Sequence, residues 1–383
     1  MRADPKFAMS QIFFLISSMQ VGGAERVAAI LCNHWARKGH AVTLMPTFSG
    51  RGGCLYPLDE RVRLVYLADL VGSRSRSVYN KVRRFLALRN SIRESGPDVI
   101  VSFLTQVNVA ALLASWGLRI PAVVSERTYP PAMSLSIGLE LMRKVTYSRA
   151  ASVVVQTQRG LQWLEACCPN TFGRVIPNPV VYPLPCGEPV VDPESVVASN
   201  KRVALAVGRL GEEKGFALLL MALGSLASQN LEWDLIILGD GSERENLEQL
   251  RDELGLKGRV HLPGRVGNPG DWYVRADLYV MSSRFEGFPN TLLEAMAHGL
   301  PAVSFDCETG PADIIRHGID GFLVPPSEGA EGLARAMDTL MRDENMRQRM
   351  GKEAIAVRDR FSAQRIMAEW DEVLGLQWVE ADV

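Results

Sequence analysis

Short apolar runs alternate with helix-patterned segments along almost the whole chain, and this alternation limits the possible folds more than any other feature. The first apolar run covers residues 12–17 and is followed by an amphipathic pattern over 24–38, and the alternation continues through both halves. A strand that is followed by a helix and another strand forms a parallel pair, because the helix is the crossover. The sequence therefore predicts an α/β protein with doubly wound parallel sheets.

A proline-rich segment divides the chain. Residues 177–193 contain six prolines, at positions 177, 179, 183, 185, 189 and 193. Proline at that density is typical of a linker, and 383 residues are too many for one ordinary domain. We therefore expect two Rossmann-like domains facing each other across a cleft, over residues 1–180 and 181–360, and a last helix within 361–383.

Composition excludes several classes of protein. The chain is 47% hydrophobic and 22% charged, as in soluble globular proteins. No apolar run is long enough to cross a membrane, and the first residues show no signal-peptide pattern. The six cysteines lack metal-binding spacing, so we expect isolated core residues in a reducing compartment. These features indicate a cytoplasmic protein.

The positive charge is concentrated in the first half. Residues 1–180 carry 22 Lys and Arg against 10 Asp and Glu, and the remainder carries 20 against 33. The segment from Arg74 to Arg93 has no acidic residue, and an apolar stripe runs through it at Val78, Val82, Phe85, Leu86 and Ile92. This pattern predicts a basic amphipathic helix, which suits an anionic membrane surface and equally suits a surface helix packed on the sheet. Nucleic acid is not expected, because no DNA- or RNA-binding motif is present.

Two glutamates mark residues 283–301 as a candidate site. Glu286 lies in a loop broken by glycine and proline, and Glu294 lies in the first turns of the following helix pattern, for which Asn290 is a plausible N-cap. The free N–H groups of such a helix start favour a diphosphate, and two carboxylates beside it can bind sugar hydroxyls. The alternative interpretation is a solvated helix start.

Two cations form a second candidate site. Arg209 and Lys214 flank a turn between an apolar strand and a helix, in the segment 208–216. A diphosphate suits this pair, since Arg binds it through a fork and Lys as a point charge. The alternative is that both cations only border a solvated loop beside Glu212 and Glu213. No DxD-type acidic cluster accompanies them, so we expect no metal.

A glycine pair follows the first predicted strand. Gly22 and Gly23 would allow a close approach of the backbone to a ligand at the helix start. The segment is neither a complete GxGxxG nor a P-loop. A tight strand–helix turn explains these two residues about as well.

The segments GRL–EEKGF and EGFPNTLLEA, in this order along the chain, resemble glycosyltransferase family 4, retaining enzymes of the GT-B fold. The resemblance implies a nucleotide-sugar donor on the second domain, an acceptor on the first, and a last helix that crosses back to the first domain. It implies catalytic roles for Arg209, Lys214 and Glu286. The donor-binding residues that it implies are Gly22, Gly23, Gly208, Gly239, Val266, Phe288, Pro289, Asn290, Thr291, Leu292 and Glu294.

The segments FLTQVN and SERT are similar to a subgroup of that family that makes bacterial surface and lipid-linked glycans. They place Gln106, Asn108, Glu126 and Arg127 as candidate acceptor-binding residues. Ser-Glu-Arg stands where many GT-B enzymes have a histidine. Arg127 would either hold an acceptor phosphate or pair with Glu126.

The resulting expectation is a metal-independent, retaining hexosyltransferase without a cofactor. It would move a hexose or an N-acetylhexosamine from a UDP-sugar to a polyprenyl-diphosphate-linked glycan, on the inner face of a bacterial membrane that its basic domain contacts. The alternatives are a nucleotide-sugar epimerase of the same fold and a non-catalytic subunit that binds nucleotide sugars.

Overall fold

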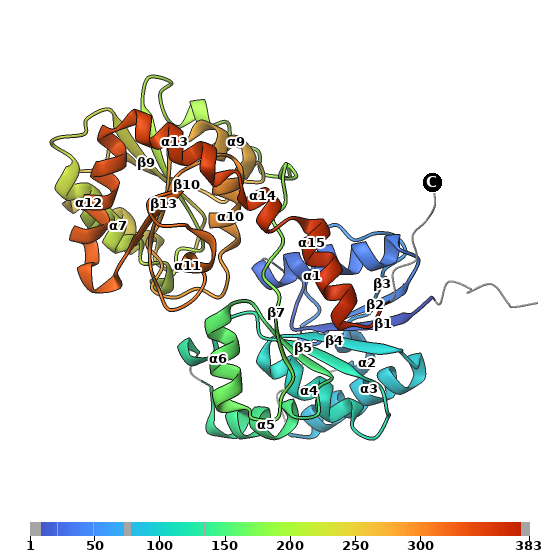
Figure 1. Cartoon of the computed structure of the whole chain (residues 1–383). Coiled ribbons are helices and arrows are strands. Elements are labelled where there is room, and N and C mark those ends of the chain that lie inside the picture. Colours follow the sequence, from blue (N-terminus) through green and yellow to red (C-terminus); the bar gives the residue numbers. More distant parts are fainter. Residues whose placement is uncertain (1–8, 21, 49, 73–77, 134, 377–383) are drawn as a thin grey trace, which may run out of the picture. The chain divides into compact units, whose positions relative to one another are not determined.

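The computed structural model describes residues 9–376 except 21, 49, 73–77 and 134. The chain forms two compact units. The first unit ends at Asn178 and takes in the chain again from Gln364, and the second covers Pro179–Ala363. Each unit is a parallel sheet covered by helices on both faces (Figure 1).

The sheet of the first unit has seven strands within the described residues, all parallel, in the order β3-β2-β1-β4-β5-β6-β7. The strands are β1 Gln11–Ile16, β2 Ala41–Pro46, β3 Arg63–Leu64, β4 Val99–Phe103, β5 Ala122–Ser125, β6 Ser152–Val155 and β7 Gly173–Val175. The helices are α1 Gly23–Arg37, α2 Leu67–Val71, α3 Val78–Ser95, α4 Thr105–Ser115, α5 Ile137–Tyr147, α6 Gln158–Cys167 and α15 Ala363–Val373.

Strand β1 is a continuous apolar run because both of its faces are buried. Its even-numbered residues Ile12 and Phe14 pack into the core beneath α1 and α15, and its odd-numbered residues Phe13 and Leu15 pack into the core beneath α2–α6. Successive side chains of a strand point to opposite faces, so a strand that is covered on both faces has no polar positions. The two cores lie on opposite sides of the sheet (Figure 1).

Asp371 of α15 anchors that helix to α1. Its carboxylate, only 2% exposed, accepts hydrogen bonds from Trp35 Nε1 at 2.9 Å and Lys38 Nζ at 2.7 Å, and lies 3.3 Å from His34 Nε2. Burial acts to raise the pKa of Asp371, but the hydrogen bonds from His34 and Lys38 outweigh it and the pKa is lowered. The charged carboxylate therefore stabilises the docked helix.

We expect the substitution Asp371→Asn to lower the free energy of unfolding by about 1–3 kcal/mol near neutral pH, the range for a hydrogen bond to a charged group. Because the folded pKa is depressed, this contribution is present above the ordinary pKa of an aspartate and is lost as the pH falls through the folded pKa. Urea unfolding of both proteins across the acid range checks this, and the two curves should converge only at low pH. A stability difference that did not change with pH would contradict it.

The second unit has a six-stranded parallel sheet within the described residues, in the order β10-β9-β8-β11-β12-β13. The strands are β8 Arg202–Val207, β9 Trp233–Leu238, β10 Val260–Gly264, β11 Leu278–Met281, β12 Ala302–Phe305 and β13 Gly321–Val324. The helices are α7 Phe216–Leu226, α8 Arg244–Glu253, α9 Pro269–Arg275, α10 Asn290–Ala297, α11 Pro311–Ile314, α12 Gly329–Arg342, α13 Glu344–Ala354 and α14 Val357–Arg360. Helices α7 and α12 share one core, and α9, α10 and α14 share the other.

Several local predictions differ from the structure. Asn290 is the first residue of α10, whereas the N-cap position is Pro289, which offers no side-chain hydrogen bond. The apolar pattern over residues 62–67 predicts a strand, of which only Arg63–Leu64 form β3. For residues 320–324 the sequence allows a hairpin or a last strand, and the structure forms the last strand, β13, parallel to β12.

The basic helix α3 also differs from its prediction. Of the predicted segment from Arg74 to Arg93, residues 74–77 lie outside the described part. Val82 and Leu86 of the predicted stripe are 52% and 50% exposed, and Ile92 is buried with Leu88 instead. Arg84 is not a free surface cation, since its guanidinium donates to the carbonyl of Thr47 and burial lowers its pKa.

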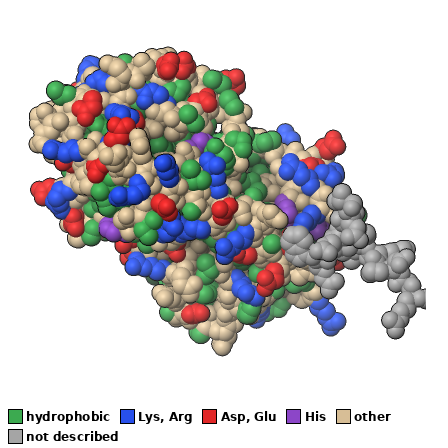
Figure 2. Space-filling view, turned by 45° about the horizontal axis from the view of Figure 1, so that its top comes forward, with side chains coloured by type: hydrophobic (Ala, Val, Ile, Leu, Met, Phe, Trp, Pro, Cys, Tyr) green, Lys and Arg blue, Asp and Glu red, His purple; other side chains and the backbone are tan. Residues whose placement is uncertain are grey.

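Positive and negative side chains are mixed on at least one face of the molecule. On the face shown in Figure 2, Lys and Arg side chains are intermingled with Asp and Glu. The formal excess of the first 180 residues therefore does not make that whole half a uniformly basic surface.

Candidate active site

The strand order of the second unit reverses between β8 and β11. Helix α7, which follows β8, packs on one face of the sheet, and α10, which follows β11, packs on the other. Such a switch point opens a crevice at the carboxyl ends of the two strands, where open α/β sheets bind ligands. The loops that leave these ends, 208–215 and 282–289, carry Arg209, Lys214 and Glu286.

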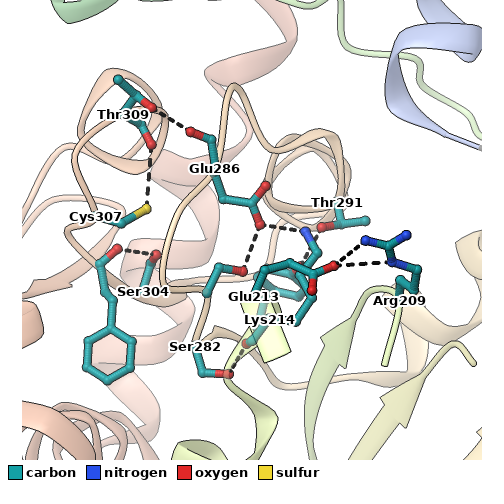
Figure 3. Close-up of polar contacts among 12 residues, drawn as sticks. Arg209, Glu213, Lys214, Ser282, Glu286, Thr291, Ser304, Cys307 and Thr309 are labelled. Carbon is teal, nitrogen blue, oxygen red and sulfur yellow. Dashed lines mark hydrogen bonds and ion pairs between the residues drawn. The ribbon is translucent and has the colours of Figure 1, made fainter. Parts of the chain in front are cut away.

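Lys214 and Glu286 join the two loops. Lys214 Nζ lies 2.7 Å from Glu286 Oε1, and the same oxygen accepts a hydrogen bond from Ser283 Oγ at 2.7 Å (Figure 3). Thr309 Oγ1 donates to the backbone carbonyl of Glu286 and fixes the loop from the β12 side. Lys214 and Ser283 therefore orient the carboxylate, and Thr309 holds the backbone that carries it.

The close contact between the loops requires a glycine. Gly215 has φ 62° and a Cβ there would lie 2.2 Å from the carbonyl oxygen of Ser282. Ser282 Oγ also donates to the carbonyl of Lys214 at 2.9 Å. Any other residue at 215 would push the loop that carries Lys214 away from the loop that carries Glu286.

Arg209 is more loosely held. Its side chain is 75% exposed and Nη2 lies 2.7 Å from Glu213 Oε1. Burial acts to raise the pKa of Glu213, but the hydrogen bond from Arg209 prevails and lowers it. An exposed pair of this kind contributes little stability, so a phosphate can displace Glu213 from the guanidinium at small cost.

Helix α10 begins directly after the loop that carries Glu286. No side chain caps its start, and Thr291 in its first turn accepts a hydrogen bond from Tyr279 Oη at 2.8 Å. The side chains of Phe288, Pro289 and Leu292 pack into the core. These three predicted donor-binding residues can therefore face a ligand only through their backbone.

Glu294 lies one turn further along α10. It is 5% exposed, and Tyr273 Oη of α9 donates to its Oε2 at 3.1 Å. The Tyr273 ring stacks on His298 with centroids 5.2 Å apart. Glu294 is thus held by a side chain of α9, whereas Glu286 is held by the loop residues Lys214 and Ser283.

The other donor-binding candidates lie at strand ends. A Cβ on Gly239, after β9, would meet the carbonyl oxygen of Gly208, after β8, at 1.8 Å. Val266 follows β10 and is half-buried. Gly22 and Gly23 begin α1 in the first unit, where a Cβ on Gly22 would lie 2.1 Å from the Glu25 carboxylate.

The acceptor-binding candidates lie at strand ends of the first unit. Glu126 is buried, accepts hydrogen bonds from Tyr147 and from Thr105 at 2.7 Å, and has its pKa raised by burial. Asn108 is also buried and bonds to Ser102 at 2.8 Å and to Tyr147 Oη at 3.1 Å. Gln106 is exposed.

Arg127 makes its hydrogen bond to Asn178, outside this cluster. It donates to Asn178 and stacks on the Phe103 ring at 4.4 Å, and among the described residues its Nε and Nη1 have no hydrogen-bond partner. Burial lowers its pKa to about 9. Of the two roles considered for Arg127, pairing with Glu126 is therefore not what the structure shows.

Sequence reasoning missed the residues that orient the site. Tyr273, Tyr279, Ser283 and Thr309 hold the glutamates and the start of α10 in place. Ser283 lies in the candidate segment 283–301 and Thr309 precedes a Gly-Pro helix start, but neither pattern indicated these hydrogen bonds. Cys307 also lies here, but burial raises its thiol pKa to about 12, so it is a protonated core residue.

Within the part of the chain that the structure describes, no three His, Cys, Asp or Glu side chains cluster as metal ligands would. Arg209 and Lys214 bring positive charge to the switch point, and Arg284 is a third cation, exposed on the loop 282–289. The arrangement can bind a diphosphate between these cations and the start of α10, with a carboxylate on either side of it.

Solved structures identify the class of the fold. HepE of Anabaena, crystallised with UDP, matches with a TM-score of 0.80 at 22% identity, over 96% of this chain and 100% of HepE. The two parallel-sheet units therefore form the GT-B fold of glycosyltransferases.

Sequence comparisons identify the family. The model described as Glycosyltransferase Family 4 matches residues 21–181, and the model described as Glycosyl transferases group 1 matches 190–357. LpsD of Rhizobium meliloti, a lipopolysaccharide core biosynthesis glycosyltransferase, is 30% identical over 281 residues, covering 72% of this chain and 74% of LpsD. The chain belongs to glycosyltransferase family 4.

Two further relatives differ in how much of their own length this chain covers. A Campylobacter jejuni N-acetyl-D-galactosaminyltransferase, named for a diphospho-undecaprenol-linked substrate, is 28% identical over 368 residues, covering 94% of this chain and 97% of that enzyme. An exopolysaccharide phosphotransferase of Streptomyces coelicolor is 30% identical over 393 residues, covering 95% of this chain. The chain spans only 40% of the length of that second relative.

Proposed function

We propose that this glycosyltransferase is a retaining enzyme that transfers a hexose or an N-acetylhexosamine from a UDP-sugar to a polyprenyl-diphosphate-linked glycan. The observation that carries the proposal is the Lys214–Glu286 pair at the switch point of the second unit, beside the start of α10. The UDP bound by HepE and the undecaprenol-linked substrate of the Campylobacter relative support the donor and acceptor classes.

In this proposal the diphosphate of the donor enters between Arg209, Lys214 and the start of α10. When the bond between the anomeric carbon and the diphosphate breaks, negative charge grows on the leaving oxygen, and the two cations and the helix start stabilise it. The acceptor oxygen bonds to the anomeric carbon on the same face, and its proton leaves with the diphosphate. No side chain is assigned as a covalent nucleophile.

The two glutamates take separate roles. Glu294, fixed by Tyr273, would bind the ribose hydroxyls. Glu286, on the loop, would bind the donor sugar near its reacting carbon, while its ion pair with Lys214 keeps both groups in place before the donor arrives. Arg127, whose Nε and Nη1 have no hydrogen-bond partner among the described residues, is the acceptor-side residue best suited to a phosphate.

A membrane-bound acceptor fixes the place of action. We infer a peripheral enzyme on the cytoplasmic face of a bacterial membrane, with the basic amino-terminal unit towards the anionic lipid. The excess of 22 Lys and Arg over 10 Asp and Glu in residues 1–180 supports this orientation.

Purified protein should be incubated with a panel of UDP-sugars and a short-chain polyprenyl-diphosphate-linked glycan, with and without EDTA. We expect UDP release that requires acceptor, an α-linked product from an α-linked donor by NMR, and activity that survives EDTA. Interconversion of UDP-sugars without an acceptor would indicate an epimerase instead, and UDP binding without turnover on any acceptor would indicate a non-catalytic subunit.

A further inference from the structure

Large apolar side chains are exposed in lines along two helices of the first unit. On α5, Ile137, Leu141 and Val145 are 86%, 62% and 51% exposed and are spaced four residues apart. On α3, Tyr79, Val82 and Leu86 are 71%, 52% and 50% exposed. These spacings place each set on one side of its helix. We call the two sets the apolar stripes.

The stripes are additional to the helix faces that form the core. Leu88 and Ile92 of α3 and Tyr147 of α5 pack into the core on the sheet side. Helix α4 lies between α3 and α5 on the same side of the sheet (Figure 1). Both stripes therefore belong to one helical layer of the first unit, and the described residues of that unit leave them uncovered.

Basic and aromatic side chains accompany the stripes. Lys81 and Arg83 lie on the exposed part of α3, and Lys144 lies on the exposed part of α5. Trp116, which ends α4, is 49% exposed, and the Arg149 guanidinium lies 3.7 Å from its ring centroid. This combination matches the chemistry of an anionic lipid surface. The apolar stripes would contact the acyl region, and the cations and the tryptophan would contact the headgroup region.

We propose that the apolar stripes of α3 and α5, together with Trp116, insert into the interfacial layer of an anionic phospholipid bilayer. The inference rests on the proposed function, since a polyprenyl-linked acceptor lies in such a bilayer. Among the described residues, no helix is long and apolar enough to cross it. Insertion of apolar groups, unlike attraction between charges, is not screened by salt. Attachment therefore weakens as salt rises but is not abolished.

The test is flotation of the full chain with sealed vesicles of phosphatidylcholine alone or mixed with phosphatidylglycerol, at about 0.1 M and about 1 M salt. The stripe variant is Ile137→Ser/Leu141→Ser/Val145→Ser. The matched control is Leu231→Ser/Val274→Ser/Ile319→Ser, which makes the same chemical change at positions of the second unit that are 65%, 76% and 47% exposed. Thermal melting and UDP binding check that both variants are folded.

We expect the unmodified chain and the control to float with the anionic vesicles and to retain part of that binding at high salt. The stripe variant should bind at least about tenfold less at both salt concentrations, as loss of the buried apolar area requires. Equal flotation of stripe variant and control, or complete release of the unmodified chain at high salt, would overturn the proposal. So would a dimer in solution that the stripe variant abolishes, which would make the stripes a contact between two copies.

Activity assays separate this inference from the proposed function. With a water-soluble short-chain acceptor, the stripe variant should turn over like the control, whereas with the same glycan on a long polyprenyl chain in vesicles its rate should fall with its binding. If the stripe variant had normal activity on the vesicle-bound acceptor, the membrane-insertion proposal would be refuted and the proposed function would stand. Absence of transfer to any acceptor would refute the proposed function and leave the flotation result standing.

Discussion

Replacing either Arg209 or Lys214 by alanine should lower kcat by about 10²–10³, the cost of removing one charge-stabilising group from an active site. Both cations lie at the switch point, and the site as described holds no other positive group as near to Glu286 as Lys214, at 2.7 Å. Each variant removes one of the cations that would stabilise the charge on a departing diphosphate. Single-turnover rates with saturating donor measure the effect on the chemical step.

The matched control for this experiment is Arg335→Ala on α12. Arg335 is as exposed as a typical surface arginine, at 63%, and pairs at 2.5 Å with Glu328, which belongs to neither of the loops 208–215 and 282–289. Its loss should change activity by less than about twofold, because exposed pairs contribute little. Activities of both site variants within a few-fold of the unmodified enzyme would refute the role in leaving-group stabilisation. Lys214→Arg should retain more activity than Lys214→Ala, since the positive charge remains.

Glu294→Gln should weaken UDP binding by about tenfold to a hundredfold, the range for a hydrogen bond to a charged group. Glu286→Gln should leave UDP binding nearly unchanged and lower turnover instead. The structure supports this division, since Glu294 is 5% exposed and fixed on the helix by Tyr273, while Glu286 lies on the loop paired with Lys214. Calorimetry with UDP, paired with turnover measurements, distinguishes the two variants.

Tyr273→Phe is the matched control, because it removes the hydrogen bond to Glu294 and keeps both the ring and the carboxylate. It should reduce UDP affinity less than Glu294→Gln. Equal losses of UDP affinity in the two glutamate variants would contradict the assignment of separate roles.

The sequence predicted which residues follow strands, and the structure adds which strands are neighbours. Glu286 and Lys214 are 72 residues apart, and their contact depends on β8 lying beside β11. Hydrophobic periodicity cannot specify that order. The family resemblance placed both residues at one site, but no sequence pattern indicated that the hydroxyl groups of Tyr273, Ser283 and Thr309 would orient the glutamates.

Helix α3 shows a different limit of sequence reasoning. The spacing of its apolar residues correctly predicted a helix, but the sheet covers Leu88 and Ile92 rather than Val82 and Leu86. Periodicity identifies an apolar face without identifying its partner. Likewise, an arginine in a basic segment is expected to be solvated, yet Arg84 donates to a backbone carbonyl.

Helix α15 links the synthesis of the chain to the completion of its first unit. Trp370 packs against Phe103 with ring centroids 5.7 Å apart, and Ile366 and Trp370 are fully buried in the core shared with α1. Residues 1–178 emerge from the ribosome before this helix is made. The apolar face around Trp35 and Phe103 is therefore exposed while the second unit is still being translated. The first unit therefore reaches its final state last, and chaperone binding during translation should map to this face.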